Sequence, residues 1–472
     1  MSKAKLFIEN FLVYGFGGII NKLIPLIMVP IVTRIMPSTD YYGISDLSNT
    51  VVQFGSALAV MGMYDAMYRM FFEKDEKEYK RRVCSTAMMF TLVTSVVVFI
   101  IMVLLRDSIA QYFFSNRKYA YVVYLSAMAT LVGATNSIIS APTRMQNKRK
   151  IFLVTNTISP LLSYSISIPL LLAGYYVVAL PLAAIISHLA MEISFAVLNK
   201  EWFNYRLFDK NLLKQLLKIA IPLFPNFLIY WLFNSCDKVM ITNMIGIGAA
   251  GIYSVGSKLG HASQLIYTAF AGGWQFFAFS TMKEENQVES NSKIFEYLGV
   301  ISFVATSFIC AWSFLIFKIL FKKDYLSGYI VAPYLFLAPL LQMLFQVAAN
   351  QFLVVKKTWP NLFILSSGAI LNIIINYFLI PVLGIEGASI ATLMGYIVSD
   401  IVCVIVLCHM KLMVVSKKFI VSFLVMIIYL IIWRILFSDV FYLGTIAALI
   451  LTGLLTILYR KDISKLVRMT KK

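Results

Sequence analysis

The sequence predicts an all-α membrane protein with about fourteen transmembrane helices. Of its 472 residues, 60% are hydrophobic and only 13% are charged, and the mean hydropathy is +0.82. A soluble chain carries about 25% charged residues, whereas an α-helix that crosses the hydrocarbon core of a bilayer needs roughly 20 apolar residues. Apolar runs of that length recur along the whole chain, which indicates a multi-pass membrane protein.

Fourteen apolar runs, separated by short polar segments, define the predicted helices in order. The first run is too long for a cleavable signal peptide and contains no small-residue cleavage site. The last two runs follow a set of twelve and are not expected to take part in cargo binding. The runs cover residues 11–35, 44–67, 84–105, 119–142, 151–173, 176–198, 217–242, 249–281, 294–317, 331–355, 361–381, 385–409, 418–437 and 440–459.

The positive charges lie mainly on one side of this predicted topology. With the N-terminus placed inside, thirty of the 41 Lys and Arg residues fall in cytoplasmic segments and six in outside loops. Because positive residues concentrate in cytoplasmic loops, the N- and C-termini are both predicted to be cytoplasmic. The net charge of +19 is therefore a topology signal, and nucleic acid is not expected as a partner.

The segment 199–218 separates six predicted spans from the next six. Lys210, Lys214 and Lys218 recur every four residues, which puts them on one face of a helix, opposite a row of leucines. Two interpretations stay open, namely an amphipathic helix lying on anionic lipid or the extended start of the seventh span. The predicted organisation is an N-terminal six-helix lobe (1–198), a cytoplasmic amphipathic linker (199–218), a C-terminal six-helix lobe (219–409), and two extra helices with a basic tail (410–472).

A weak internal repeat supports two lobes with equal numbers of helices. Tyr42-Gly43-Ile44 opens the second span and Ala250-Gly251-Ile252 opens the eighth, and each motif follows a span that contains two prolines. Because six spans separate the copies, both run in the same direction, which makes the repeat parallel. Proline-interrupted helices at matching positions of two halves indicate where a transporter would bind its cargo.

Short motifs from residue 15 to about residue 395 occur in the order and spacing of one family. They are FGGIINK (16–22), PIVTRIMP (30–37), DYYG (40–43), FDK (208–210), DK (237–238), GIYSV (251–255) and GIEGASIAT (384–392). On these motifs the chain resembles the polysaccharide-unit flippases, the Wzx-type members of the multidrug/oligosaccharidyl-lipid/polysaccharide exporter superfamily.

The resemblance implies two six-helix lobes around a V-shaped central cavity, with two additional C-terminal helices. Members carry a lipid-pyrophosphate-linked oligosaccharide of the undecaprenyl-pyrophosphate type across the bacterial cytoplasmic membrane by alternating access, for surface polysaccharide biosynthesis. The expected partners are this cargo, membrane lipids and the polysaccharide polymerase machinery, and no cofactor is expected.

Cations inside apolar spans are the candidate cargo-binding residues, because an intramembrane charge is energetically unfavourable and usually functional. At 1.5 Å per residue, Lys22 lies about 17 Å into the first span and Lys258 about 14 Å into the eighth. We expect these two lysines to clamp a diphosphate from opposite lobes, since an ammonium binds phosphate as a point charge and can release it. Arg34 and Lys238 lie near the outer ends of their spans, and Arg69 closes the second span on the cytoplasmic side, where it could contact the cargo first.

Acidic residues in the spans are candidate counter-ions or coupling-ion sites. They are Asp46 and Asp65 in the second span and Asp237 in the seventh. A buried pair of Lys22 with Asp46 or Asp65 is the alternative to the phosphate clamp. Asn136 is one of several neutral polar residues that could line a path for sugars.

Two further features of the spans carry structural predictions. Arg434, in the thirteenth span, is expected to reach the lipid headgroups by snorkelling. The five cysteines lie in apolar segments without metal-ligand spacing, so we expect no metal site.

A flippase is the function that these observations favour. The alternative is a multidrug and toxin extrusion-type exporter of the same superfamily, which is cation-coupled and takes cationic drugs, and would need acids at the positions held by Lys22 and Lys258. An enzyme, such as a polysaccharide polymerase or ligase, would need a sizeable outside loop with catalytic groups. No predicted outside loop is longer than the segments 106–118 and 318–330, so no enzymatic activity is expected.

Overall fold

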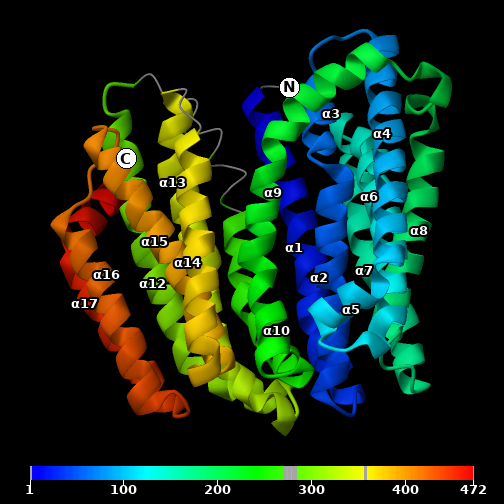
Figure 1. Cartoon of the computed structure of the whole chain (residues 1–472). Helices are drawn as coiled ribbons and strands as arrows, with labels where there is room; N and C mark the ends of the chain where they lie inside the picture. Colours follow the sequence, from blue (N-terminus) through cyan, green and yellow to red (C-terminus); the bar gives the residue numbers. More distant parts are fainter. Residues whose placement is uncertain are drawn as a thin grey trace. The chain divides into compact units, whose positions relative to one another are not determined.

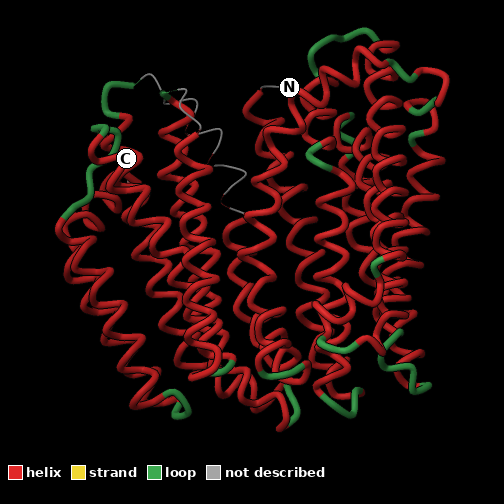
Figure 2. The backbone as a smooth tube through the Cα atoms, in the orientation of Figure 1, coloured by secondary structure: helices red, strands yellow, loops and turns green. Residues whose placement is uncertain are grey.

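The computed structural model describes residues 3–268, 270, 274, 278, 284–355 and 359–470. Every regular element among these residues is a helix, which confirms the all-α prediction (Figure 2). Packing divides the chain into two compact units, Met1–Ser254 and Val255–Lys472. The lobe boundaries at residues 198, 218 and 409 stay predictions.

The first unit consists of long membrane-type helices joined by a few short ones (Figure 1, blue to green). α2, α4 and α8 pack against α6, while α1 lies against α7. The elements are α1 (Lys3–Ile35), α2 (Thr39–Val60), α3 (Met63–Phe71), α4 (Lys77–Leu104), α5 (Arg106–Phe114), η1 (Arg117–Tyr119), α6 (Ala120–Met145), α7 (Arg149–Leu172), α8 (Ala179–Leu198), η2 (Lys200–Trp202), η3 (Tyr205–Leu207), α9 (Lys210–Met244) and the first part of α10 (Ile247–Gly260).

The second predicted span, 44–67, is not one continuous helix. α2 ends at Val60, and α3 begins after Met61 (φ 48°) and Gly62 (φ 75°), which both have left-handed backbone conformations. A left-handed conformation favours glycine, and a Cβ atom on Gly62 would lie 2.8 Å from the carbonyl oxygen of Ala220 in α9. The prediction was wrong here because the apolar pattern continues through a point where the backbone turns.

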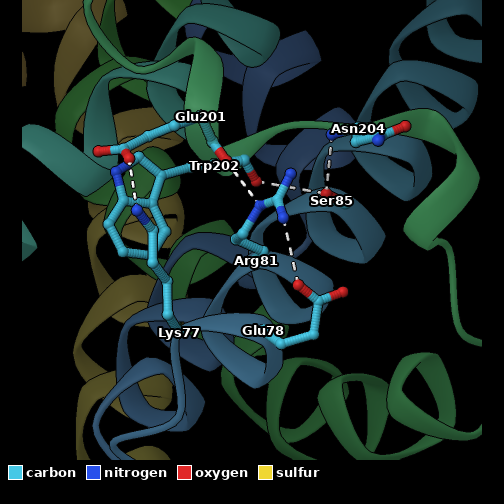
Figure 3. Close-up of polar contacts among 7 residues, drawn as sticks. All are labelled: Lys77, Glu78, Arg81, Ser85, Glu201, Trp202 and Asn204. Atoms are coloured by element: carbon cyan, nitrogen blue, oxygen red, sulfur yellow. Dashed lines mark hydrogen bonds and ion pairs between the residues drawn. The ribbon is translucent and has the colours of Figure 1, made fainter.

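Hydrogen bonds fix the segment between α8 and α9 to the first turns of α4 (Figure 3). Arg81 Nε donates to the carbonyl oxygen of Glu201 (2.8 Å). Ser85 Oγ donates to the carbonyl oxygen of Trp202 (3.3 Å) and accepts from the backbone N–H of Asn204 (3.0 Å). Trp202 is also buried, so both polar and apolar contacts attach this segment to the first unit.

An exposed ion pair adds to this attachment. Lys77 Nζ lies 2.8 Å from Glu201 Oε2, and both side chains are largely accessible to solvent. The hydrogen bond from Lys77 holds the pKa of the Glu201 carboxyl below its ordinary value. Because the pair is exposed, it contributes far less to stability than the backbone hydrogen bonds beside it.

Residues 210–218, within the predicted linker, form the first turns of α9. Asp209 is the N-cap, and its Oδ1 accepts hydrogen bonds from the backbone N–H groups of Asn211 (2.8 Å) and Leu212 (3.1 Å). Leu212 and Leu216 are buried against α3 and α4, while the three lysines of this stretch are exposed. These turns therefore belong to the same helix as the seventh span, and protein covers their leucine face. The amphipathic linker over residues 199–218 stays a prediction. Figure 1 shows these turns inclined to the rest of α9.

The second unit is organised around α13, which is buried along almost its whole length. α12 and α15 pack against α13, α14 packs against α15, and α16 and α17 cover α12. The elements are the rest of α10, η4 (His261–Ser263), α12 (Gln287–Leu320), η5 (Lys323–Ile330), α13 (Val331–Val354), α14 (Trp359–Leu383), α15 (Ile385–His409), α16 (Lys417–Ile432), the π-helical turn η6 (Trp433–Phe437) and α17 (Phe441–Thr470).

The two C-terminal helices are joined to this unit by specific polar contacts. Arg434 Nε and Nη2 donate to the two carboxylate oxygens of Glu386 in α15 (2.6 and 2.9 Å). The Tyr429 hydroxyl donates to the carbonyl oxygen of Ser307 in α12 (3.0 Å). Arg434 therefore has a carboxylate partner within this unit, and its expected snorkelling to the headgroups stays a prediction.

Eleven helices among the described residues are long and apolar enough to cross a membrane. They correspond to all predicted spans except the first, second and eighth. Helices α1 and α2 occupy the first two of these positions, and part of the eighth span (249–281) lies outside the described residues. The chain is a multi-pass membrane protein, and the number fourteen stays a prediction.

Candidate functional site

Three of the predicted site residues lie together in a buried polar cluster of the first unit. Lys238 Nζ of α9 is 2.6 Å from Asp46 Oδ2 of α2, and Ser254 Oγ of α10 donates to the same carboxylate oxygen (2.8 Å). Asp237 Oδ1 accepts from the backbone N–H of Lys238 (3.1 Å), and Asp237 Oδ2 accepts from the hydroxyl of Tyr253. Each of these five residues is 9% exposed or less, so the cluster joins three helices away from solvent.

This geometry makes Asp46 the counter-ion of Lys238. A phosphate could bind the Lys238 ammonium only by competing with a carboxylate that already neutralises it. Breaking a buried ion pair by removing one partner is destabilising by about 3–5 kcal/mol, because the other charge is left uncompensated. The pair therefore has the properties of a helix–helix contact, and cargo binding by Lys238 stays a prediction.

The two glycines of the internal repeat bring α2 and α10 into backbone contact. A Cβ atom on Gly43 would collide with the carbonyl oxygen of Ile247, and one on Gly251 would collide with that of Thr39. Small residues allow membrane helices to approach this closely. The approach places the hydroxyl of Ser254 beside the buried ion pair.

A polar cavity of about 290 Å³ lies inside the first unit, among α1, α3, α6, α7 and α8. Most of its wall consists of amide and hydroxyl side chains, and within this wall Asn21 Nδ2 donates to Asn156 Oδ1 (3.2 Å). Arg144 is the cation among the lining residues, which include no Asp or Glu. The lining residues are Asn21, Tyr64, Asn136, Ser137, Ser140, Ala141, Thr143, Arg144, Phe152, Thr155, Asn156, Ser159, Met191 and Phe195.

Helical spacing explains why these side chains share one cavity. On α6, Asn136, Ser140 and Arg144 recur every four residues and lie on one face. α7 presents Phe152 and Asn156 at the same spacing. The sequence prediction selected Asn136 but not the rest, since it searched for single intramembrane charges rather than for polar stripes at helical spacing.

Arg144 connects the cavity to the predicted residues of α3. It lies close enough to interact electrostatically with Asp65 and to hydrogen-bond to Tyr64. Asp65 and Arg69 are four residues apart on α3, so they lie on the same face. Asp65, predicted as a counter-ion, thus lies in the field of a cation that the sequence prediction did not select.

The other predicted cations are distributed over both units. Lys22 is exposed on α1 and directly follows Asn21 of the cavity wall, and Arg34 is exposed in the last turn of α1. Lys258 is half-buried in the part of α10 that belongs to the second unit. The diphosphate clamp of Lys22 and Lys258 stays a prediction. Within the described part of the chain, no group of three or more His, Cys, Asp or Glu side chains could hold a metal ion.

Comparisons with known proteins agree on family and fold. A family model described as "Polysaccharide biosynthesis protein" matches residues 7–283. The chain is similar to the structure of the lipid II flippase MurJ in an inward closed conformation, with a TM-score of 0.73 and 15% identity over 97% of this chain and 99% of that chain. No curated protein sequence matches it.

Two further structures show the same fold at similarly low identity. A mutant of the Vibrio cholerae MATE transporter VcmN gives a TM-score of 0.62 and 12% identity over 85% of this chain and 96% of that chain. A MOP superfamily transporter from Pyrococcus furiosus gives a TM-score of 0.61 and 14% identity over 86% of this chain and 95% of that chain. Each likeness establishes the fold of membrane transporters for this chain.

Proposed function

Because the chain belongs to the polysaccharide biosynthesis protein family, we propose that it flips a lipid-pyrophosphate-linked oligosaccharide repeat unit across the bacterial cytoplasmic membrane by alternating access. The lipid carrier is of the undecaprenyl-pyrophosphate type, and the flipped unit is passed to the polymerase machinery of a surface polysaccharide. MurJ, which has the same fold, is named for flipping lipid II.

The polar cavity of the first unit is the observation that carries this proposal. An oligosaccharide presents many hydroxyl groups, which exchange hydrogen bonds with amide and hydroxyl side chains such as Asn21, Asn136 and Asn156. Phe152 in the same wall adds an apolar surface for a sugar ring. The cavity volume of about 290 Å³ is at the lower end of the range for ligand pockets, which suits one sugar residue at a time.

The charge of the cavity favours an anionic or neutral cargo over a cationic drug. An exporter of cations would need a carboxylate in the wall. The lining residues offer the guanidinium of Arg144 instead, and Asp65, whose carboxyl interacts with Arg144, is not among them. A guanidinium binds phosphate or carboxylate oxygens through two parallel hydrogen bonds. We propose that Arg144 receives the pyrophosphate or an acidic sugar first, and that Lys22, next to the cavity wall, and Lys258 complete the anion path.

A transport assay tests this function directly. The purified chain is reconstituted in proteoliposomes with a fluorescent undecaprenyl-pyrophosphate-linked oligosaccharide, and the rate of its transbilayer movement is measured at limiting cargo. Losing a hydrogen bond to a charged group amounts to about 1.5–3 kcal/mol, so we expect Arg144→Gln to slow transport by roughly 10- to 150-fold. The matched control is Arg117→Gln, since Arg117 is an exposed arginine in η1, outside the cavity.

Two results would contradict the proposal. The first is normal flipping by Arg144→Gln together with normal flipping by a variant in which Asn136 and Asn156 are both Ala, which would refute the role of this cavity in cargo binding. The second is export of a cationic dye by the native chain without movement of the lipid-linked cargo, which would favour the extrusion-type exporter. The predicted cytoplasmic position of the C-terminus is tested separately. A reporter that is active only outside the cell should stay silent when it is fused after Lys472.

A further inference from the structure

Asp65 of α3 lies beside the cation of the polar cavity in the first unit. α3 and α6 pack through a shared apolar cluster, in which Ala66 of α3 and Met145 of α6 are both buried. Asp65 directly precedes Ala66, and Arg144 directly precedes Met145. This packing brings the Asp65 carboxylate into the electrostatic field of the Arg144 guanidinium, although Asp65 itself is not a lining residue of the cavity.

Two aromatic side chains hold the guanidinium at the cavity. The hydroxyl oxygen of Tyr64 accepts a hydrogen bond from Arg144, and the Cζ atom of Arg144 lies 5.9 Å from the centre of the Phe152 ring. Both Tyr64 and Phe152 line the cavity. A guanidinium has five N–H donors, so Arg144 can keep these two contacts and still bind either a carboxylate or a phosphate.

The interaction between Asp65 and Arg144 can be exchanged for another. Asp65 lies in the first turn of α3 and Arg144 in the last turn of α6, and both side chains are exposed. An exposed ion pair is weak, so separating its partners costs little. A pyrophosphate diester carries two negative charges and Asp65 carries one, so the pyrophosphate can replace this carboxylate on the guanidinium.

α3 also offers the displaced carboxylate a second partner. Arg69 follows Asp65 by four residues and is exposed, so the two side chains lie on one face of α3. An acid and a base at this spacing can pair across one helical turn. The Asp65 carboxylate can therefore leave Arg144 of α6 and turn to a cation of its own helix.

We propose that Asp65 is a positioning residue that exchanges with the pyrophosphate of the cargo on Arg144. Asp65 holds the guanidinium before the cargo binds, yields it to the pyrophosphate, and takes it back when the cargo leaves. Because the two anions compete for one cation, Asp65 weakens cargo binding and speeds release, and a carrier needs release on the far side of the membrane. This inference rests on the proposed flippase function and on the role of Arg144 in it.

Binding and transport by the full chain test the proposal through Asp65→Asn, which removes the charge and keeps the shape of the side chain. In detergent micelles the probe is geranyl pyrophosphate, and geraniol is its uncharged counterpart. We expect Asp65→Asn to bind geranyl pyrophosphate about two- to fivefold more tightly than the native chain does, with no change for geraniol. In proteoliposomes with a lipid-linked cargo of neutral sugars, the cargo concentration at half-maximal rate and the maximal rate should both fall.

Three further variants assign the effect to Arg144. Asp65→Glu keeps the charge and should bind geranyl pyrophosphate like the native chain. Asp107→Asn is the matched control and should also bind like the native chain, because Asp107 is an exposed acid in the first turn of another nine-residue helix, α5, outside the cavity. Arg144→Gln with and without Asp65→Asn should bind equally, since Asp65 acts through Arg144.

The proposal is overturned if Asp65→Asn binds geranyl pyrophosphate no more tightly than the native chain, if geraniol binding or Asp107→Asn shows the same gain, or if the gain persists in Arg144→Gln. Asp65→Ser replaces Asp65→Asn if size-exclusion chromatography shows that the latter does not fold. A native chain that moves no lipid-linked cargo would contradict the proposed function instead, and the binding measurements would then still confirm or refute the exchange at Arg144.

Discussion

The buried pair of Asp46 and Lys238 allows the sharpest test of how the first unit is stabilised. The Nζ–Oδ2 distance is 2.6 Å, and the side chains are 5% and 11% exposed. Replacing Lys238 by Met leaves the Asp46 carboxylate buried without its ammonium partner. We expect a loss of about 3–5 kcal/mol in the free energy of unfolding, and a similar loss for Asp46→Asn.

A double-mutant cycle measures the pair itself. The variant that carries both Asp46→Asn and Lys238→Met removes both charges of the pair, so we expect it to be clearly more stable than the sum of the single losses predicts. Unfolding is followed by tryptophan fluorescence in mixed micelles of increasing denaturing detergent. Lys77→Met is the matched control, because Lys77 belongs to an exposed pair whose removal should leave the unfolding transition nearly unchanged.

The same variants decide between a structural and a cargo-binding lysine. If Lys238→Met unfolds like the native chain and yet no longer transports, Lys238 binds cargo and the structural interpretation is refuted. If the loss of stability appears and the double variant recovers both stability and transport, the pair is a helix–helix contact.

Three other predictions follow from contacts that the structure shows. Gly251→Leu should prevent the close approach of α2 and α10 and lower the yield of folded protein on size-exclusion chromatography. Gly453→Leu is the control, because a Cβ atom there meets nothing within 4 Å, and it should not lower the yield. Equal yields from the two variants would refute the backbone contact. A chain that ends at Lys418 loses the Arg434–Glu386 pair and should accumulate at a reduced level, and so should Arg434→Met. Normal levels of both variants would show that α16 and α17 are dispensable for folding. The small Lys77–Glu201 contribution should be fully present above pH 4.5, the ordinary pKa of the Glu201 carboxyl, and should be lost as pH falls through the lowered value. Limited proteolysis of residues 199–209 in the native chain should then increase slightly below about pH 4.5. The variant Glu201→Gln should be cut equally above and below that pH.

Local patterns were sufficient for the fold class and most of the helices. Each span is an apolar run whose length is set by the bilayer, so the hydropathy of neighbouring residues already contains the information. Breaks inside a span were not visible in this way. Met61 and Gly62 interrupt the second span where Ala220 of α9 approaches Gly62, and that contact involves a residue far along the chain.

Length, hydropathy and charge are local properties, so the sequence was sufficient to predict a helical membrane protein with charged residues in its spans. It also identified Asp46, Asp237 and Lys238 as unusual. That Asp46 meets Lys238 and Ser254 depends on helix packing and could not be predicted from the sequence. Ser254 and Asp46 are 208 positions apart and come together through the approach of two glycine-bearing helices. The same holds for the polar cavity, which is lined by the polar stripes of both α6 and α7, and for Asp400 of α15, whose carboxylate oxygens have no hydrogen-bond partner among the helices around it. A charge can be read from one position, but its partner is set by the packing of helices that are distant in sequence.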